Sequence, residues 1–324
     1  MTQNQPYTLF QEDCRHGLPR LAADSIDFIV TDPPYFIDGM GDDWNDTKLK
    51  HKAAKAGIVG GLPVGMKFDR EQGRRLQAFM QPLAAEFLRV LKPGGFCIVF
   101  SQGRLYHRVA QALDNAGFEI RDMLGWKYEG QAKAFSPNHF IRKDKSLLDS
   151  EKAKLIAELK GLKTPQLKPQ IEPMSLAQKP REGTFVENWQ KYGVGLLDTR
   201  ESLDGRFPGN IMEVSKQGKN SDKIDHMTVK PVALIAHLIK LFTRPGQTVL
   251  DPFAGSGSHG AAALQTGRRF IGFEIEPRYC RFAEDRLQKY AGIETPAIAE
   301  KQRQSSATVK QNRTESFSEA LFAA

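Results

Sequence analysis

The stretch IDFIVTDPPY, residues 26–35, decides how the fold of this chain is predicted. Its first half is a short apolar run that predicts a buried strand, and the prolines mark the end of that strand. A second stretch, TVLDPFAGSG at residues 248–257, repeats the pattern of an apolar run followed by Asp-Pro, and it continues into a glycine loop and a helix-like segment at residues 260–264. The two stretches therefore predict two strands that each lead into a polar loop.

Further strands and helices are expected around these two stretches. Strands are predicted at residues 95–100, after the turn Lys92-Pro93-Gly94, and at residues 118–124 and 269–273. Helical spacing of apolar residues appears at residues 76–91 and 232–242, and a helix with Pro277 in its first turn is expected after the last strand. Alternating strands and helices predict an α/β sheet.

Composition sets wider bounds. With 324 residues, of which 40% are hydrophobic, the chain can form one large core or two modest ones, and its net charge of +8 weakly favours polyanionic partners. No apolar run approaches the ~18 residues that a membrane span needs, and the start of the chain has no signal pattern, so a cytoplasmic protein is expected. Cys14, Cys97 and Cys280 are far apart without metal-ligand spacing. They predict neither a metal site nor disulfides, but reduced packing residues.

The glycine loop has the properties of a nucleoside-binding site. Gly255 and Gly257 let the backbone approach a ligand closely, and Glu274, at the end of the next predicted strand, can accept hydrogen bonds from ribose hydroxyls. Gly260 completes the G-x-G-x-x-G spacing of dinucleotide-binding proteins. However, the preceding Asp251-Pro252-Phe253 is foreign to a dinucleotide turn, and a dinucleotide site would leave residues 32–35 unexplained.

The tetrapeptide at residues 32–35 suits chemistry on the exocyclic amine of a nucleobase. Such an amine is a poor nucleophile because its lone pair is conjugated into the ring. The Asp32 carboxylate and the Pro33 carbonyl can accept its two hydrogens, while Pro33 and Pro34 fix the backbone and Tyr35 stacks on the base. The base must first leave the duplex, at a cost of a few kcal/mol. Taken alone, the tetrapeptide is also compatible with a plain turn after a strand.

Together, the two motifs resemble those of the amino-methylating DNA methyltransferases, and their order resembles the beta group of that family. The resemblance implies a Rossmann-like methyltransferase sheet in circularly permuted order, S-adenosyl-L-methionine as cofactor and double-stranded DNA as substrate. Asp32 at the first motif position favours adenine over cytosine-N(4). The alternatives are a cytosine-N(4) enzyme and a DNA-binding regulator without turnover. Methylation of RNA or of a protein glutamine is disfavoured by the motif order and by Asp32.

The resemblance also assigns site residues. The catalytic group is Asp32, Pro33, Pro34 and Tyr35. Segment 226–231 is similar to the family's His-x-Thr-x-Lys-Pro element, in which Lys230 would meet the methionine carboxylate, and Asp13 and Cys14 resemble a Gly-Asp-Cys segment in which Glu12 here replaces the glycine. The implied cofactor-binding residues are Asp13, Cys14, Thr228, Lys230, Asp251, Phe253, Gly255, Ser256, Gly257 and Glu274.

The resemblance also implies how the chain is organised. We expect a catalytic domain at residues 1–295, an insertion for target recognition within it at residues 136–225, and a flexible polar tail at residues 296–324. Residues 142–169 contain eight basic and four acidic side chains, which predicts either a solvated amphipathic helix or a DNA-facing segment. Residues 180–225 predict loops that reach a groove or cover the sheet. Segments 168–180 and 183–188 look like those of phage-type members, which suggests a phage or prophage origin. The sequence does not decide whether the protein forms a homodimer or has a restriction endonuclease partner.

Overall fold

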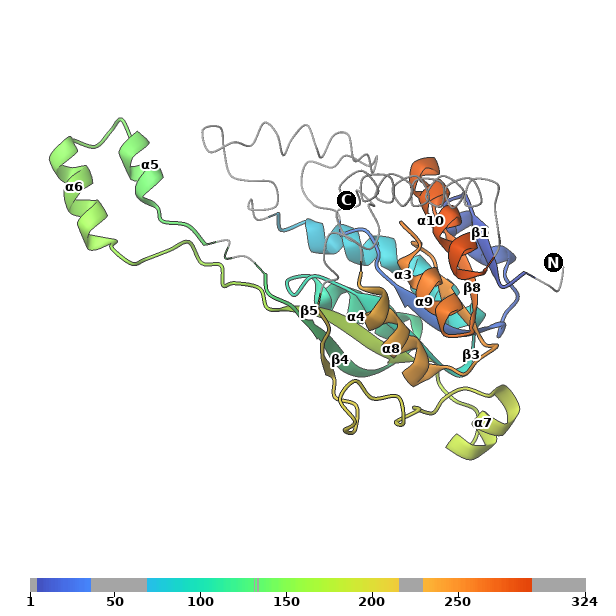
Figure 1. The fold of residues 1–324 in the computed structure, drawn as a ribbon. Coiled ribbons are helices and arrows are strands. Elements are labelled where there is room, and N and C mark those ends of the chain that lie inside the picture. Colours follow the sequence, from blue (N-terminus) through green and yellow to red (C-terminus); the bar gives the residue numbers. More distant parts are fainter. Residues whose placement is uncertain (1–4, 36–68, 131, 133, 216–229, 293–324) are drawn as a thin grey trace, which may run out of the picture.

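The computed structural model describes residues 5–35, 69–130, 132, 134–215 and 230–292. Its elements form one mixed α/β unit (Figure 1). The strands are β1 Tyr7–Phe10, β2 Ile26–Thr31, β3 Leu91–Phe100, β4 Glu119–Lys127, β5 Ile171–Gln178, β6 Ile211–Glu213, β7 Thr248–Asp251 and β8 Arg269–Phe273. The helices are α1 Cys14–Gly17, the 3-10 turn η1 Leu18–Arg20, α3 Gln72–Val90, α4 Tyr106–Ala116, α5 Asn138–Lys143, α6 Asp149–Glu158, α7 Phe185–Tyr192, α8 Val232–Phe242, α9 Ser258–Gln265 and α10 Pro277–Tyr290.

The sheet confirms the predicted permuted order. Its strands are arranged β1-β8-β7-β2-β3-β5-β4-β6, so β7, which comes late in the chain, lies directly beside β2. The two strands are parallel, with Phe28 opposite Val249 and Ile29 opposite Leu250. Only β5 among the paired strands runs against its neighbours, β3 and β4. The loops after β2 and β7 therefore leave the sheet at the same edge, here called the carboxyl edge; the opposite edge is the amino edge.

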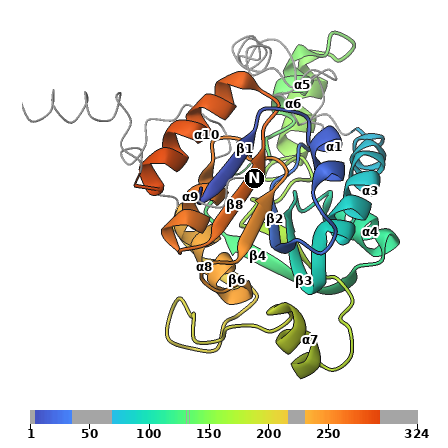
Figure 2. The ribbon, with the colours of Figure 1, turned by 90° about the vertical axis from the view of Figure 1, so that its right-hand side faces the viewer.

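Successive side chains of each strand point to opposite faces of the sheet, so each face has its own hydrophobic core. Phe28 and Val30 of β2 pack on one face with residues of α8, α9 and α10, whereas Ile29 packs on the other face with residues of α1, α3 and α4. Figure 2 shows the two helical layers on either side of the strands. Because both faces are covered, every residue of β2 is buried, as its apolar sequence predicts.

Several elements differ from the prediction. Strand β3 begins at Leu91 and so includes the expected turn at residues 92–94, where its pairing with β2 is irregular between Ile26 and Phe28. Residues 180–225 are not only loops, because they contain α7 and β6. The predicted tail lies outside the described residues.

The expected insertion at residues 136–225 contributes both to the sheet and to a projection. Strands β5 and β6 belong to the sheet, whereas α5 and α6 form an arm, residues 134–165, that extends far from it (Figure 1). The two connecting segments pair where the Thr164 amide donates to the Phe135 carbonyl and the Phe135 amide donates to Thr164 Oγ1. Since β4 ends and β5 begins at the carboxyl edge, the arm leaves the sheet on the same edge as the two motif loops.

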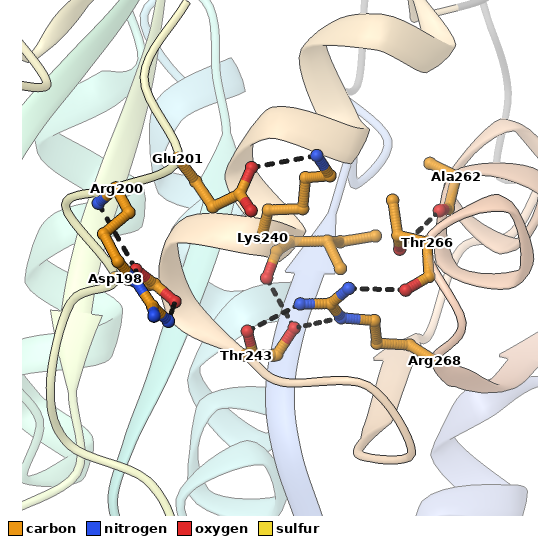
Figure 3. A network of polar contacts seen from close by, with 9 residues as sticks. Asp198, Arg200, Glu201, Lys240, Thr243, Ala262, Thr266 and Arg268 are labelled. Carbon is orange, nitrogen blue, oxygen red and sulfur yellow. Dashed lines mark hydrogen bonds and ion pairs between the residues drawn. The ribbon is translucent and has the colours of Figure 1, made fainter. Parts of the chain in front are cut away.

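The amino edge is closed by a polar network (Figure 3). The buried Arg268 guanidinium donates to the Thr243 carbonyl at 2.7 Å and to Thr243 Oγ1 at 3.0 Å. Nearby, Lys240 at the end of α8 pairs with Glu201 at 2.9 Å. Arg268 thus ties the end of α8 to the loop before β8, and Glu201 ties α8 to the segment between α7 and β6.

The three cysteines are free and buried, as predicted. Burial raises the pKa of the Cys14 thiol to about 12, which makes it a packing group and not a nucleophile. In the part of the chain that the structure describes, no helix has the length and apolar character to cross a bilayer.

Candidate active site

Asp251 links the two motif loops at the carboxyl edge. It is fully buried, and its Oδ1 accepts hydrogen bonds from Thr31 Oγ1 at 2.6 Å and from the Phe253 amide at 3.0 Å. Its Oδ2 lies 2.6 Å from Nδ1 of His259 in α9. Thr31 immediately precedes Asp32, so Asp251 fixes the start of the catalytic motif against the start of the glycine loop. Both carboxylate oxygens of Asp251 therefore have hydrogen-bond partners within the protein.

The glycine loop and Glu274 meet as the sequence predicts. Gly255 has φ +52° and Gly257 has φ +77°, conformations that favour glycine. The Gly255 amide donates to Glu274 Oε2 at 2.8 Å, and the Glu276 amide donates to Oε1 at 2.8 Å. Burial raises the pKa of Glu274, although the two amides act in the opposite direction.

This carboxylate retains acceptor capacity for a ligand. Ionised carboxylates offer about four lone-pair sites, and the two amides occupy only two of them. Glu274 and the positive-φ glycines therefore fit a nucleoside cofactor whose ribose hydroxyls donate hydrogen bonds. The glycine loop is itself held from below, because Arg286 of α10 donates to the Ser256 carbonyl at 3.1 Å. The Ser256 side chain is buried on that inner side and faces the Ser258 hydroxyl.

Asp13 and Cys14 also lie at the carboxyl edge. They follow β1, which pairs with β8, and the Glu274 amide donates to the Phe10 carbonyl at 3.0 Å. Asp13 caps α1 and forms an ion pair with Arg15 at 2.6 Å. Cys14 packs in the core below. Phe253 of the glycine loop is half-buried against Phe79 of α3, with ring centroids 5.9 Å apart.

Asp32 is held by two side chains. The Tyr35 hydroxyl donates to Asp32 Oδ1, and Lys230 Nζ lies 2.5 Å from Asp32 Oδ2. Lys230 is only 6% exposed, and burial alone would lower its pKa; Asp32 and Glu172 outweigh that effect and raise it. The ammonium therefore stays charged. Burial, followed by the nearby Asp32 and Glu172 carboxylates, also raises the pKa of Tyr35 well above its usual range.

Lys230, which the resemblance assigns to the methionine carboxylate of the cofactor, lies beside the catalytic tetrapeptide. Its ammonium is paired with the catalytic carboxylate and with Glu172, whose Oε1 lies 2.8 Å away. Thr228, the other cofactor-binding residue expected in this element, lies outside the described residues. Pro33 is buried and Pro34 is partly exposed, and the Tyr35 carbonyl accepts a hydrogen bond from Gln72 at 2.7 Å. The tetrapeptide is anchored at both ends.

Glu172 is the site residue that sequence reasoning missed. It stands at the start of β5, and because β5 is antiparallel, its first residues lie at the carboxyl edge with Asp32. The Phe100 ring lies 5.0 Å from the Lys230 ammonium, and Tyr128 has its pKa raised by burial and by the charge of Glu172. Trp126, two residues before Tyr128, is buried, and its indole N–H donates to the Val214 carbonyl at 2.8 Å.

The site therefore has two adjoining parts. One part offers glycine backbone and the Glu274 carboxylate, which suit a nucleoside. The other offers the Asp32 carboxylate beside aromatic rings, which suits a planar group that carries an amine. Since β2 and β7 are neighbours, both parts open on one edge of the sheet, where open α/β sheets bind their ligands.

Comparison with known proteins agrees with this geometry. The chain is 28% identical over 308 residues to the type II methyltransferase M.HindIII of Haemophilus influenzae, a match that covers 86% of this chain and 94% of the relative. It is 29% identical over 279 residues to the putative methylase YubD of Escherichia coli, covering 86% and 88% of the two chains.

Solved structures share the fold. The PvuII DNA methyltransferase, described as cytosine-N4-specific, superposes with a TM-score of 0.57 at 18% identity, covering 89% of this chain and 90% of that one. A protein from Thermus thermophilus described as a putative DNA modification methylase, solved with S-adenosyl-L-methionine, has a TM-score of 0.52 at 20% identity, covering 88% and 94% of the two chains. Finally, the family model of the N6/N4 DNA methylases matches residues 26–285, a span that includes both motif loops. The chain belongs to this DNA methylase family.

Proposed function

We propose that the protein is a site-specific DNA methyltransferase that acts on the N6 amine of adenine. The observation that carries the proposal is the position of Asp32, whose carboxylate stands at the end of β2, beside the glycine loop of β7, and is oriented by Tyr35 and Lys230. The choice of adenine rests on Asp as the first residue of the motif, which the resemblance to the beta group associates with adenine.

The cofactor is S-adenosyl-L-methionine, which supplies a methyl group on a sulfonium centre. Glu274 accepts hydrogen bonds from the ribose hydroxyls, and Gly255 and Gly257 allow the backbone to approach the ligand closely. Transfer to an amine is a direct displacement, so the protein's contribution is alignment and exclusion of water, with no covalent bond to the enzyme. The free and buried cysteines are consistent with this.

Asp32 and the Pro33 carbonyl hold the target amine. Each accepts one of its hydrogens, which favours a pyramidal nitrogen whose lone pair faces the methyl group. The nitrogen becomes cationic as the new bond forms, and the negative charge of Asp32 stabilises that cation before its proton is released to solvent. The base reaches this position only when it is rotated out of the duplex, where it stacks on Tyr35.

Sequencing of DNA from cells that express the protein tests the choice of base. We expect N6-methyladenine at one recurring sequence, and its absence from cells that express Asp32→Ala. Recovery of N4-methylcytosine in its place would leave the mechanism standing and overturn the substrate. Cells without any new modification would contradict the proposed function.

We further propose that the arm contacts DNA as part of the target-recognition region. It leaves the sheet at the carboxyl edge, and none of the residues of α6 is buried. Lys154 and Lys160 are exposed, and Lys152 makes a 3.4 Å contact with the fully exposed Asp149. Solvation alone does not explain why the two helices project from the sheet, whereas an arm beside the site can follow the phosphate backbone.

Replacing Lys152, Lys154 and Lys160 by Gln should weaken binding to specific and random duplexes alike. Each lost phosphate contact should reduce the log-log salt slope of binding by about 0.9, as measured by fluorescence anisotropy over a salt titration. The matched control replaces three lysines that lie toward the amino edge, in α7, α8 and α10: Lys191, Lys240 and Lys289. Equal slopes for the arm variant and the wild type would show that the arm is only a solvated helix pair.

A further inference from the structure

Among the residues that the structure describes, the buried cluster around Lys230 contains one positive and two negative groups. The ammonium lies 2.5 Å from Asp32 and 2.8 Å from Glu172, and the two carboxylate side chains are only 14% and 19% exposed. A single carboxylate is enough to neutralise a buried lysine. The second one leaves the cluster with an excess negative charge beside the position assigned to the target amine.

A second carboxylate also changes what Asp32 can do. If Lys230 had Asp32 as its sole partner, any turn of Asp32 toward an incoming amine would leave a buried ammonium unpaired, which is strongly unfavourable. With Glu172 in contact, Lys230 keeps a counter-ion while Asp32 adjusts. Glu172 also lies beside the Tyr35 hydroxyl, so both groups that orient Asp32 are in contact with Glu172.

We propose that Glu172 is a positioning residue for methyl transfer: it holds Lys230 and Tyr35 so that the Asp32 carboxylate is free to accept a hydrogen of the target amine. This inference rests on the proposed function and adds a residue from β5 to the motif residues. Its contacts with Lys230 and Tyr35 place its action on the amine side of the site.

Glu172→Gln provides the first test. We expect the single-turnover methylation rate of the preformed complex with S-adenosyl-L-methionine and DNA to fall by on the order of 100-fold, the effect of misplacing a reacting group. The affinity for S-adenosyl-L-methionine, the KM for DNA and the melting temperature should change little. Glu172→Asp, which keeps the charge on a shorter side chain, should restore part of the rate.

The matched control is Glu201→Gln. Glu201 pairs with Lys240 at the amino edge (Figure 3). About 12 Å of helix α8 separates Val232, which lies just after Lys230, from Lys240. The two variants remove the same charge from a Glu–Lys contact. The methylation rate of Glu201→Gln should match that of the wild type. If Glu172→Gln lowers the melting temperature but leaves the rate of the folded protein unchanged, Glu172 is merely structural and the inference is wrong.

A double substitution gives a sharper criterion. In Lys230→Met the two carboxylates face each other without a cation, so Glu172→Gln should there relieve repulsion and raise the methylation rate. The same substitution thus lowers the rate in the wild type and raises it in the Lys230→Met background. Equal effects in both backgrounds would overturn the inference. A wild type that transfers no methyl group would instead overturn the proposed function, so the two failures are distinguishable.

Discussion

Asp32→Ala should lower the rate of methyl transfer by on the order of 10³-fold or more, the loss expected when a preorganised group that stabilises developing charge is removed. The affinity for S-adenosyl-L-methionine should stay within a few-fold of the wild type, because Asp32 is assigned to the target amine and Glu274 to the cofactor. Single-turnover transfer of a labelled methyl group measures the first quantity, and calorimetry measures the second.

The structure also predicts that this variant folds. Without Asp32, Lys230 still lies 2.8 Å from Glu172, so its buried charge keeps a partner. The melting temperature should therefore change little. Asp32→Asn keeps one carbonyl acceptor of similar size without the charge, and it should retain more activity than the alanine variant. Turnover of Asp32→Ala near the wild-type rate would remove Asp32 from the mechanism.

The second large effect is expected for Glu274→Ala. Two ribose hydroxyls that donate to a carboxylate contribute about 1.5–3 kcal/mol each, and each 1.4 kcal/mol is about tenfold in Kd. Loss of both bonds should weaken S-adenosyl-L-methionine binding by about 100-fold or more. The loop should also loosen, since the Gly255 and Glu276 amides lose their acceptor. Isothermal titration calorimetry gives the Kd.

The raised pKa of Glu274 should make the affinity for S-adenosyl-L-methionine depend on pH. Burial raises its pKa above the usual value, and only the ionised form accepts from both hydroxyls. As the pH falls through that raised pKa, wild-type affinity should decline, whereas the affinity of Glu274→Gln should be lower at neutral pH and nearly flat. A wild-type Kd that is unchanged by Glu274→Ala would place the ribose elsewhere.

The sequence predicts the two motif strands and their neighbours well, because their signals are local. Residues 26–30 and 248–250 are short apolar runs bounded by Asp-Pro, and a strand buried on both faces needs that composition. The pairing of Glu274 with the glycine loop also follows from sequence, since consecutive strands β7 and β8 are parallel neighbours. What local signals cannot give is the identity of distant partners.

Strand β5 shows why. Pro173 argues against a central strand, yet it lies beyond the last pair of the ladder with β3, Phe100 with Met174, so its missing N–H interrupts nothing there. Because β5 was not predicted, nothing in the sequence gave a reason to place Glu172 at the site. Helix α7 was missed although its signal is present: Thr184 and Glu187 form a capping box, with the Thr184 hydroxyl accepting from the Glu187 amide at 3.2 Å.

Lys230 illustrates a second limit. Its motif predicts proximity to the site, but its contacts with Asp32 and Glu172 come from the fold. The antiparallel strand brings Glu172 to one side of the ammonium and β2 brings Asp32 to the other.

The most direct test of the account is the transfer itself. Purified protein is incubated with duplex DNA and S-adenosyl-L-methionine labelled in its methyl group, and the DNA is then digested to nucleosides and analysed by mass spectrometry. We predict label on the exocyclic amine of adenine with the wild type and, over the same incubation, at most a trace of it with Asp32→Ala. Unlabelled DNA, or label recovered only in RNA or protein, would contradict the claim that the two motif loops form one site for methylating DNA.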